Sequence, residues 1–291
     1  MKTKYKEMVS GYLFILPALV LIITFSIVPI LLSGYYSLTQ FNVVNPPVFI
    51  GLDNYRTMLN DISVSASLRN TIWFTVFKVP LQTVFALVIA ALLAAKFRNL
   101  LGNFTKAVLF IPVISSAVLT GYIWSTLLAT ESGLINMIIT SFGLPGVNWL
   151  GQPATARIGV LMAAIWRDLG YFMVIFYAGI MEIPKTLYEA AEVDGASRTQ
   201  QFFYITLPLL KPVTYLIVIL GTIWAFQMFD LPFTMTGGGP GRATLTMVYL
   251  VYNSAFRFFT MGYASAVAML LFFVILIISA IQRFAMRYAT D

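Results

Sequence analysis

Six long apolar stretches dominate the sequence and limit what the chain can fold into. Each contains few charges, and a bilayer core about 30 Å thick needs about 20 apolar residues to be crossed by one helix. The stretches cover residues 11–32, 71–95, 107–128, 158–181, 213–233 and 263–281. We therefore predict an all-α polytopic membrane protein with six transmembrane helices. The first stretch is too long for the apolar core of a signal peptide, so we expect it to be retained.

Composition agrees with this class and excludes several kinds of chemistry. Hydrophobic residues make up 59% of the 291 residues and charged residues only 10%, whereas an average soluble domain is roughly 25% charged. The chain has no Cys and no His, which removes thiolate nucleophiles, imidazole bases and the commonest metal ligands. It also lacks a phosphate-binding G-x-x-x-x-G-K-[ST] loop, so it cannot hydrolyse ATP itself. We expect neither an enzyme nor a cofactor or metal site on this chain.

Positive charges are distributed unequally between the two sides of these stretches. With the N-terminus placed inside, eleven Lys and Arg residues fall in cytoplasmic segments and five in outer ones. Cytoplasmic loops of membrane proteins carry such an excess, so we predict that both termini are cytoplasmic. The predicted organisation is a cytoplasmic N-terminal segment of residues 1–10, a single transmembrane domain of residues 11–285 and a tail of residues 286–291. The net charge of +7 then reflects orientation and does not indicate nucleic-acid binding.

The cytoplasmic loop between the fourth and fifth stretches has the pattern of a helical hairpin. Pro184 can open a helix, and two alanines on one face of it would let another surface approach closely. That face consists of Leu187, Ala190, Ala191 and Asp194, at the spacing of successive helical turns. Gly195 can end this helix with left-handed backbone, and Ser197 can cap a second helix that stops at Pro208 and Pro212. A solvated loop is the open alternative.

The same loop carries a motif of three fixed clusters. Glu189-Ala190-Ala191, Gly195 and Ile205-x-Leu207-Pro208 have the spacing EAA-x3-G-x9-I-x-L-P. This motif resembles the signature of the membrane subunits of binding-protein-dependent ABC importers. The resemblance implies the type I ABC importer transmembrane fold, with a coupling hairpin at residues 182–212 whose first short helix docks on a cytoplasmic ATPase subunit. The residues that it assigns to ATPase coupling are Glu189, Ala190, Ala191, Asp194 and Gly195.

Further segments resemble one branch of that family, the sugar permeases of the maltose and glycerol-3-phosphate type. The resemblance covers roughly residues 10–285. The matching segments are Tyr12-Leu13 with Leu16-Pro17, Gly51-Leu52-Asp53-Asn54-Tyr55, Asn70-Thr71, Phe110-Ile111-Pro112, Trp124, Gly133-Leu134-Ile135-Asn136, Ala178-Gly179-Ile180, Ile183-Pro184, and Phe229-Asp230 with Thr236-Gly237-Gly238-Gly239-Pro240. The chain departs from the branch at Lys78, where an apolar residue is expected.

The resemblance also implies partners and a substrate. The chain would form half of a translocation pathway together with a second homologous permease subunit in a bacterial or archaeal cytoplasmic membrane. Two cytoplasmic ATPase subunits would hold the ATP and Mg, and an extracytoplasmic binding protein would deliver the carbohydrate. A di- or oligosaccharide is the expected substrate, and glycerol-3-phosphate or a related polyol phosphate is the alternative. An ion-gradient-driven secondary carrier is the competing class, although no pair of related halves is evident.

Polar and aromatic residues within two of the stretches are candidates for the sugar pathway, because aromatic faces stack on sugars and planar polar groups bind hydroxyls. These candidates are Trp166, Arg167, Asp168 and Tyr171 in the fourth stretch, and Trp224, Gln227 and Asp230, which recur at three-residue spacing, in the fifth. Contacts with the second permease or with backbone carbonyls are the open alternative. Adjacent helical residues point about 100° apart, so we expect Arg167 and Asp168 not to face one another. Lys78 is expected to snorkel toward the outer end of its helix.

Overall fold

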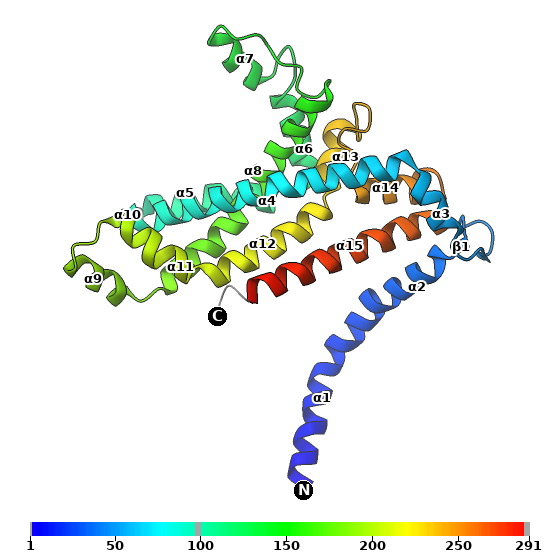
Figure 1. Ribbon diagram of the computed structural model, residues 1–291, viewed down its shortest axis with the longest axis horizontal. Helices are drawn as coiled ribbons and strands as arrows, with labels where there is room; N and C mark the ends of the chain where they lie inside the picture. The colour runs from blue at the N-terminus through cyan, green and yellow to red at the C-terminus, as the bar shows by residue number, and fades with distance from the viewer. Residues whose placement is uncertain (1, 97–99, 288–291) are drawn as a thin grey trace. The chain divides into compact units, whose positions relative to one another are not determined.

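Figure 1 shows the computed structural model of the chain, which describes residues 2–96 and 100–287. Four helices are long and apolar enough to cross a membrane, and two bent helix pairs bring the number of spans to six when each pair counts as one. The four long spans are Gly11–Ser37, Ile62–Lys96, Pro153–Glu182 and Met261–Ala285. The predicted helical, polytopic class is therefore confirmed. Within the described residues the only sheet is the antiparallel pair β1 (Thr39–Gln40) and β2 (Val48–Phe49).

One compact unit comprises Met1–Asp61 and Leu250–Phe272. Its elements are α1 (Lys2–Ile22), the π-helical turn η1 (Ile23–Ile27), α2 (Val28–Ser37), the two strands, α3 (Asp53–Asn60), the end of α14 (Met247–Tyr252), the π-helical turn η3 (Asn253–Arg257) and the first part of α15 (Met261–Arg287). The span formed by α1, η1 and α2 contributes no buried residue in its most apolar window. The Asn54 side-chain amide ties α3 to the strand region, because it donates to the carbonyls of Ser37 at 2.8 Å and Thr39 at 2.9 Å.

The second unit comprises Ile62–Tyr249 and Phe273–Asp291. Its elements are α4 (Ile62–Lys96), α5 (Leu100–Ile114), α6 (Ala117–Leu127), α7 (Leu134–Ser141), α8 (Pro153–Glu182), α9 (Lys185–Val193), α10 (Arg198–Gln201), η2 (Phe202–Thr206), α11 (Leu207–Leu209), α12 (Lys211–Phe226), α13 (Asp230–Thr236), the start of α14 (Met247–Tyr252) and the end of α15. α4 packs along α8 and α12, as Figure 1 shows. Ala86 and Ala90 of α4 and Phe172 and Phe176 of α8 are all completely buried in this core. The alanines suit a membrane core because small side chains let helices approach closely.

The third span is broken, so the predicted single helix over residues 107–128 is wrong. α5 and α6 meet at a bend of 102°, and Ser116 between them has extended backbone with a ψ of 134°. Pro112 lies within α5 about one turn before this break. Its ring has no N–H to donate and clashes with the preceding turn, which is the usual cause of a sharp helix break.

The fifth span is also broken, and the predicted helix over residues 213–233 ends early. α12 stops at Phe226, and helix resumes only at Asp230, the first residue of α13. Pro232 explains the gap, because it lacks the N–H that an unbroken helix would donate to the Met228 carbonyl. The Thr246 hydroxyl donates to that carbonyl instead, at 2.7 Å. The break is thus stabilised by a residue of the glycine-rich segment that follows α13.

The second helix of the predicted hairpin does not stop at Pro208. α10, η2 and α11 continue without interruption to Leu209, and the chain then bends by 64° into α12. Pro212 lies in the first turn of α12, where proline is tolerated because the N–H groups of a first turn have no partner within their own helix. Pro208 lies inside the continuous helix, directly after the π-helical turn η2, in which the Leu207 N–H donates to the Phe202 carbonyl.

Candidate functional site

The turn of the hairpin of residues 182–212 has the local structure that its sequence predicts. α9 follows Pro184 and ends at Val193, and Gly195 has a φ of +80°. This left-handed residue lets the Ala196 N–H donate to the Ala191 carbonyl at 2.8 Å, which closes the helix end. Ser197 caps α10 and exchanges hydrogen bonds with Gln200 in a capping box. Two local signals, a glycine at a helix end and a capping serine, therefore define the turn.

The first helix of this hairpin is unusually exposed. None of the nine residues of α9 is buried, and its apolar side chains Leu187 and Val193 are 42% and 89% exposed. Glu189, Ala190 and Asp194 are also exposed, while Ala191 is half-buried. A short helix with accessible apolar side chains outside the transmembrane helices is suited to contact with another protein.

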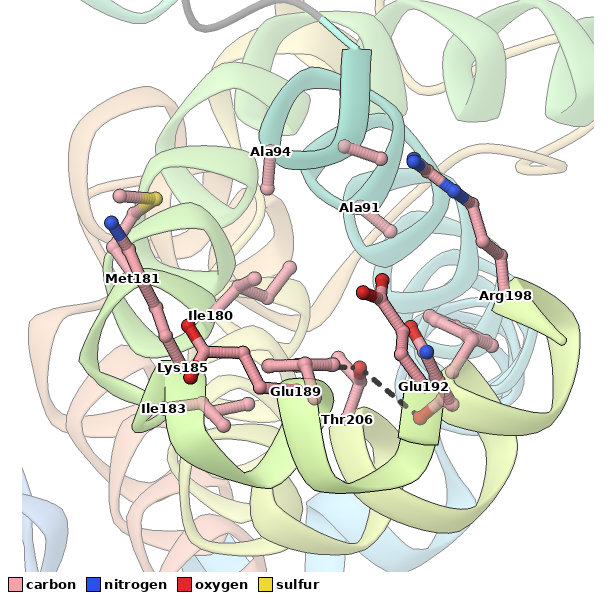
Figure 2. Close-up of a pocket in the computed structure, with 14 residues that line it drawn as sticks. Ala91, Ala94, Ile180, Met181, Ile183, Lys185, Glu189, Glu192, Arg198 and Thr206 are labelled. Atoms are coloured by element: carbon pink, nitrogen blue, oxygen red, sulfur yellow. Dashed lines mark hydrogen bonds between the residues drawn. The ribbon is translucent and has the colours of Figure 1, made fainter. Parts of the chain in front are cut away.

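A cavity of about 440 Å³ lies behind α9. Figure 2 shows Ala91 and Ala94 of α4 on one side of it and Glu189 and Glu192 of α9 on the opposite side. Residues of α8, α10 and η2 complete its lining. The space separates much of α9 from the ends of α4 and α8 that lie nearest to it.

A chain of charges, buried at its Lys78 end, joins α4, α8 and α13. The Lys78 ammonium lies 2.6 Å from the Asp168 carboxylate, and the Arg167 Nε donates to the other oxygen of that carboxylate at 2.7 Å. Arg167 in turn lies 4.0 Å from the Asp230 carboxylate. Burial decreases along the chain, because the side chains of Lys78, Asp168, Arg167 and Asp230 are 1%, 6%, 19% and 48% exposed.

Two expectations about these charges are wrong. Lys78 does not snorkel, because the packing of α4 along α8 places a carboxylate within reach of its stem. Arg167 and Asp168 do interact, because the flexible Arg side chain bends back to its neighbour although the two Cα–Cβ bonds diverge. Diverging Cα–Cβ bonds on a helix therefore keep short neighbouring side chains apart, but a long side chain such as Arg can still reach its neighbour.

Aromatic side chains surround the break between α12 and α13. The Trp224 ring lies 4.9 Å from the Tyr171 ring and 5.3 Å from the Phe172 ring. Trp166 is 39% exposed and packs edge-on to Trp124 at 6.0 Å. The predicted stripe on one continuous helix is wrong. Its three members lie within α12 (Trp224), at the end of α12 (Gln227) and at the start of α13 (Asp230).

The structure nevertheless brings members of both candidate groups together at this break. Tyr171 of α8 contacts Trp224 of α12, and Arg167 of α8 faces Asp230 of α13. Gln227 is exposed in the segment between α12 and α13. Sequence reasoning missed Lys78 as a member of the cluster. The available signal was charge complementarity, since an isolated cation in one span and an isolated anion in another stabilise each other in a membrane.

The fold defines the class as a multi-pass membrane protein. Within the described residues no group of three or more acidic side chains is arranged to hold a metal ion.

Comparison with known proteins identifies the family. A family model described as the binding-protein-dependent transport system inner membrane component matches residues 12–287, and the chain belongs to this family. It is 33% identical to the trehalose/maltose transport system permease protein MalF of Thermococcus litoralis, over 100% of this chain and 98% of that protein. It is likewise 33% identical to the lactose transport system permease protein LacF of Rhizobium radiobacter, over 96% and 94% of the two chains.

A solved structure with the same fold is the bacterial alginate ABC transporter in complex with an alginate pentasaccharide-bound periplasmic protein. One of its chains matches with a TM-score of 0.87 at 20% identity, over 100% of this chain and 98% of that chain. The resemblance drawn from the inner motif is therefore confirmed. The protein is a transport permease subunit and not an enzyme, and the competing class of secondary carrier is excluded.

Proposed function

We propose that the chain forms half of the translocation pathway of an ATP-driven importer of uncharged di- or oligosaccharides. It would work in a bacterial or archaeal cytoplasmic membrane beside a second permease subunit, with both termini and the hairpin inside. Two cytoplasmic ATPase subunits would bind the ATP and Mg, and an extracytoplasmic binding protein would deliver the sugar. The two full-length relatives named for disaccharide transport support this substrate class.

The observation that carries the proposal is the hairpin, whose first helix α9 is exposed and whose turn is defined by Gly195 and Ser197. Glu189, Ala190, Ala191 and Asp194 would contact an ATPase subunit, and Gly195 would keep the turn between the two short helices. α9 has accessible apolar side chains but lies outside the spans, so lipid does not account for them. Closure of the ATPases around ATP would move this helix and its counterpart in the second permease. Alternating access needs such an element, whose position both the nucleotide and the sugar can bias.

The cluster at the α12–α13 break is the proposed sugar pathway. Trp166, Tyr171 and Trp224 would offer ring faces to the sugar. Gln227, Asp230 and Arg167 would offer hydrogen bonds to its hydroxyls, with Asp168 holding Arg167 in place. An aromatic and planar polar set of this kind binds carbohydrate without needing a charge on it.

Charge balance in the cluster favours a neutral sugar over a polyol phosphate. Two cations, Lys78 and Arg167, are already matched by two anions, Asp168 and Asp230. A phosphate beside Arg167 would add negative charge close to the Asp168 and Asp230 carboxylates, and the cluster has no further cation to match it. A hydroxyl can instead accept or donate a hydrogen bond while these pairs stay intact.

Purification of the tagged chain from its host in mild detergent tests the assembly. We expect mass spectrometry to find one ATPase with a phosphate-binding loop and one second permease. Recovery of the chain alone, or only as a homo-oligomer, in several mild detergents would contradict the proposal. For the substrate, the purified complex in liposomes with its binding protein should import neutral disaccharide in an ATP-dependent manner. Preferential import of glycerol-3-phosphate would overturn the substrate class.

A further inference from the structure

α9 is joined to the rest of its unit by few side-chain contacts. None of its residues is buried, and the cavity behind it leaves room for the helix to shift without displacing α4 or α8 (Figure 2). If α9 is moved by a partner, some firmer connection has to carry that movement toward the transmembrane helices.

Tyr188 supplies that connection. Its hydroxyl lies 2.8 Å from the Thr206 hydroxyl. In the part of the chain that the structure describes, no other side-chain hydrogen bond leads from α9 to another helix. Tyr188 is half-buried in a helix that is otherwise largely exposed, and Thr206 is only 6% exposed.

Thr206 is well placed to pass a displacement onward. It is the last residue of the π-helical turn η2, which continues directly into α11. Leu210, which is 1% exposed, lies at the 64° bend directly before α12. π-Helical turns inside helices often mark functional positions, because the extra residue per turn lets the helix change register locally. Thr206 is thus joined through α11 and Leu210 to α12, whose far end carries Trp224 and is followed by Gln227.

We propose that Tyr188 is a positioning residue that links α9 to α12 through Thr206 and so transmits movement of α9 to the α12–α13 break. The proposal rests on the ATPase-coupling function proposed above. The hydroxyl–hydroxyl bond makes η2 follow α9, and the cavity lets both move past the ends of α4 and α8. Loss of the bond leaves α9 able to dock on its partner but frees it to shift within the cavity without moving α12.

The test is the ratio of ATP hydrolysed to sugar imported by the complete complex in liposomes with its binding protein. Tyr188→Phe removes only the hydroxyl, and we expect it to keep the ATPase bound while raising the ratio about threefold or more, within the range seen for residues on coupling routes. Thr206→Val should act in the same way. The double variant should match Thr206→Val, because both lack the Tyr188–Thr206 bond and both lack the longer bond, at 3.5 Å, from the Thr206 hydroxyl to the Gln201 carbonyl. Thr206→Ser keeps the hydroxyl and should therefore keep the wild-type ratio.

Tyr204→Phe is the matched control, because Tyr204 lies on the same turn η2 but is 80% exposed. It should leave the ratio unchanged. An unchanged ratio in Tyr188→Phe, additive effects in the double variant, or an equal effect of Tyr204→Phe would overturn the link through Thr206. A wild-type chain that binds no ATPase would overturn the proposed function itself, so the two failures are distinguishable.

Discussion

At the scale of single residues, the two partners of the buried ion pair in the second and fourth spans are not equivalent. Asp168 has a second partner in Arg167, whereas among the described residues the only ion pair of Lys78 is with Asp168. Asp168→Asn therefore leaves a buried ammonium without a counter-ion, which costs about 3–5 kcal/mol. Lys78→Met leaves the carboxylate paired and should cost less. We expect the double variant to recover most of the stability, because Arg167 keeps Asp230.

The melting temperature of the detergent-solubilised protein, followed by size-exclusion chromatography, measures this order. Arg56→Gln is the matched control. It also breaks an ion pair, to Asp53, but the two side chains are 79% and 59% exposed, so its loss should be barely detectable. Equal destabilisation by Asp168→Asn and Lys78→Met would contradict the asymmetry.

At the scale of elements, local rules predicted some features well. The turn of the hairpin follows from Gly195 and Ser197, because both act on the backbone within a few residues. The break before α13 was not predicted, although Pro232 was visible, because a proline does not by itself end a helix: Pro80 lies within the unbroken α4. At Pro232 the freed Met228 carbonyl has another partner. That partner is Thr246, and it comes from a loop whose position the sequence pattern does not give. Lys78 escaped prediction for the same reason, since its carboxylate lies on another helix.

The turn of the hairpin leads to a prediction about function. Gly195 and Gly143 have similar φ values of +80° and +76°, and a Cβ at either position would meet no atom within 4 Å. Alanine at each position should therefore carry the same backbone strain, about 1–2 kcal/mol. We expect Gly195→Ala to lower sugar uptake about threefold or more, because it alters the angle between α9 and α10, and Gly143→Ala to leave uptake unchanged. Equal uptake by the two variants, at equal abundance in the membrane, would argue against a coupling role.

Packing of α5 against α8 gives a second prediction at this scale. A Cβ added to Gly170 of α8 would collide with the Leu109 backbone carbonyl of α5. Gly170→Ala must therefore separate the two helices, and we expect it to destabilise the solubilised protein by about 1–3 kcal/mol, as overpacking does. Gly11→Ala in α1 is the control, since its Cβ would meet nothing within 4 Å and alanine favours helix. A melting temperature that Gly170→Ala leaves unchanged would contradict this close approach.

At the scale of the whole molecule, the orientation in the membrane determines which face meets the ATPase. The excess of Lys and Arg in alternate loops predicts that the hairpin is cytoplasmic. The opposite orientation would put α9 outside, where no ATP-hydrolysing partner could reach it. The proposed function therefore depends on a topology that charge distribution predicts and that a labelling experiment can measure directly.

The absence of cysteine from the sequence makes that experiment clean, because one introduced thiol is the only one in the chain. Ser141, at the end of α7, and Ser197, at the start of α10, are both exposed. In intact cells a membrane-impermeant maleimide should label Ser141→Cys. It should label Ser197→Cys only after the membrane is made permeable. The reverse pattern would place the hairpin outside and end the coupling proposal, whereas the expected pattern leaves α9 on the side where ATP is hydrolysed.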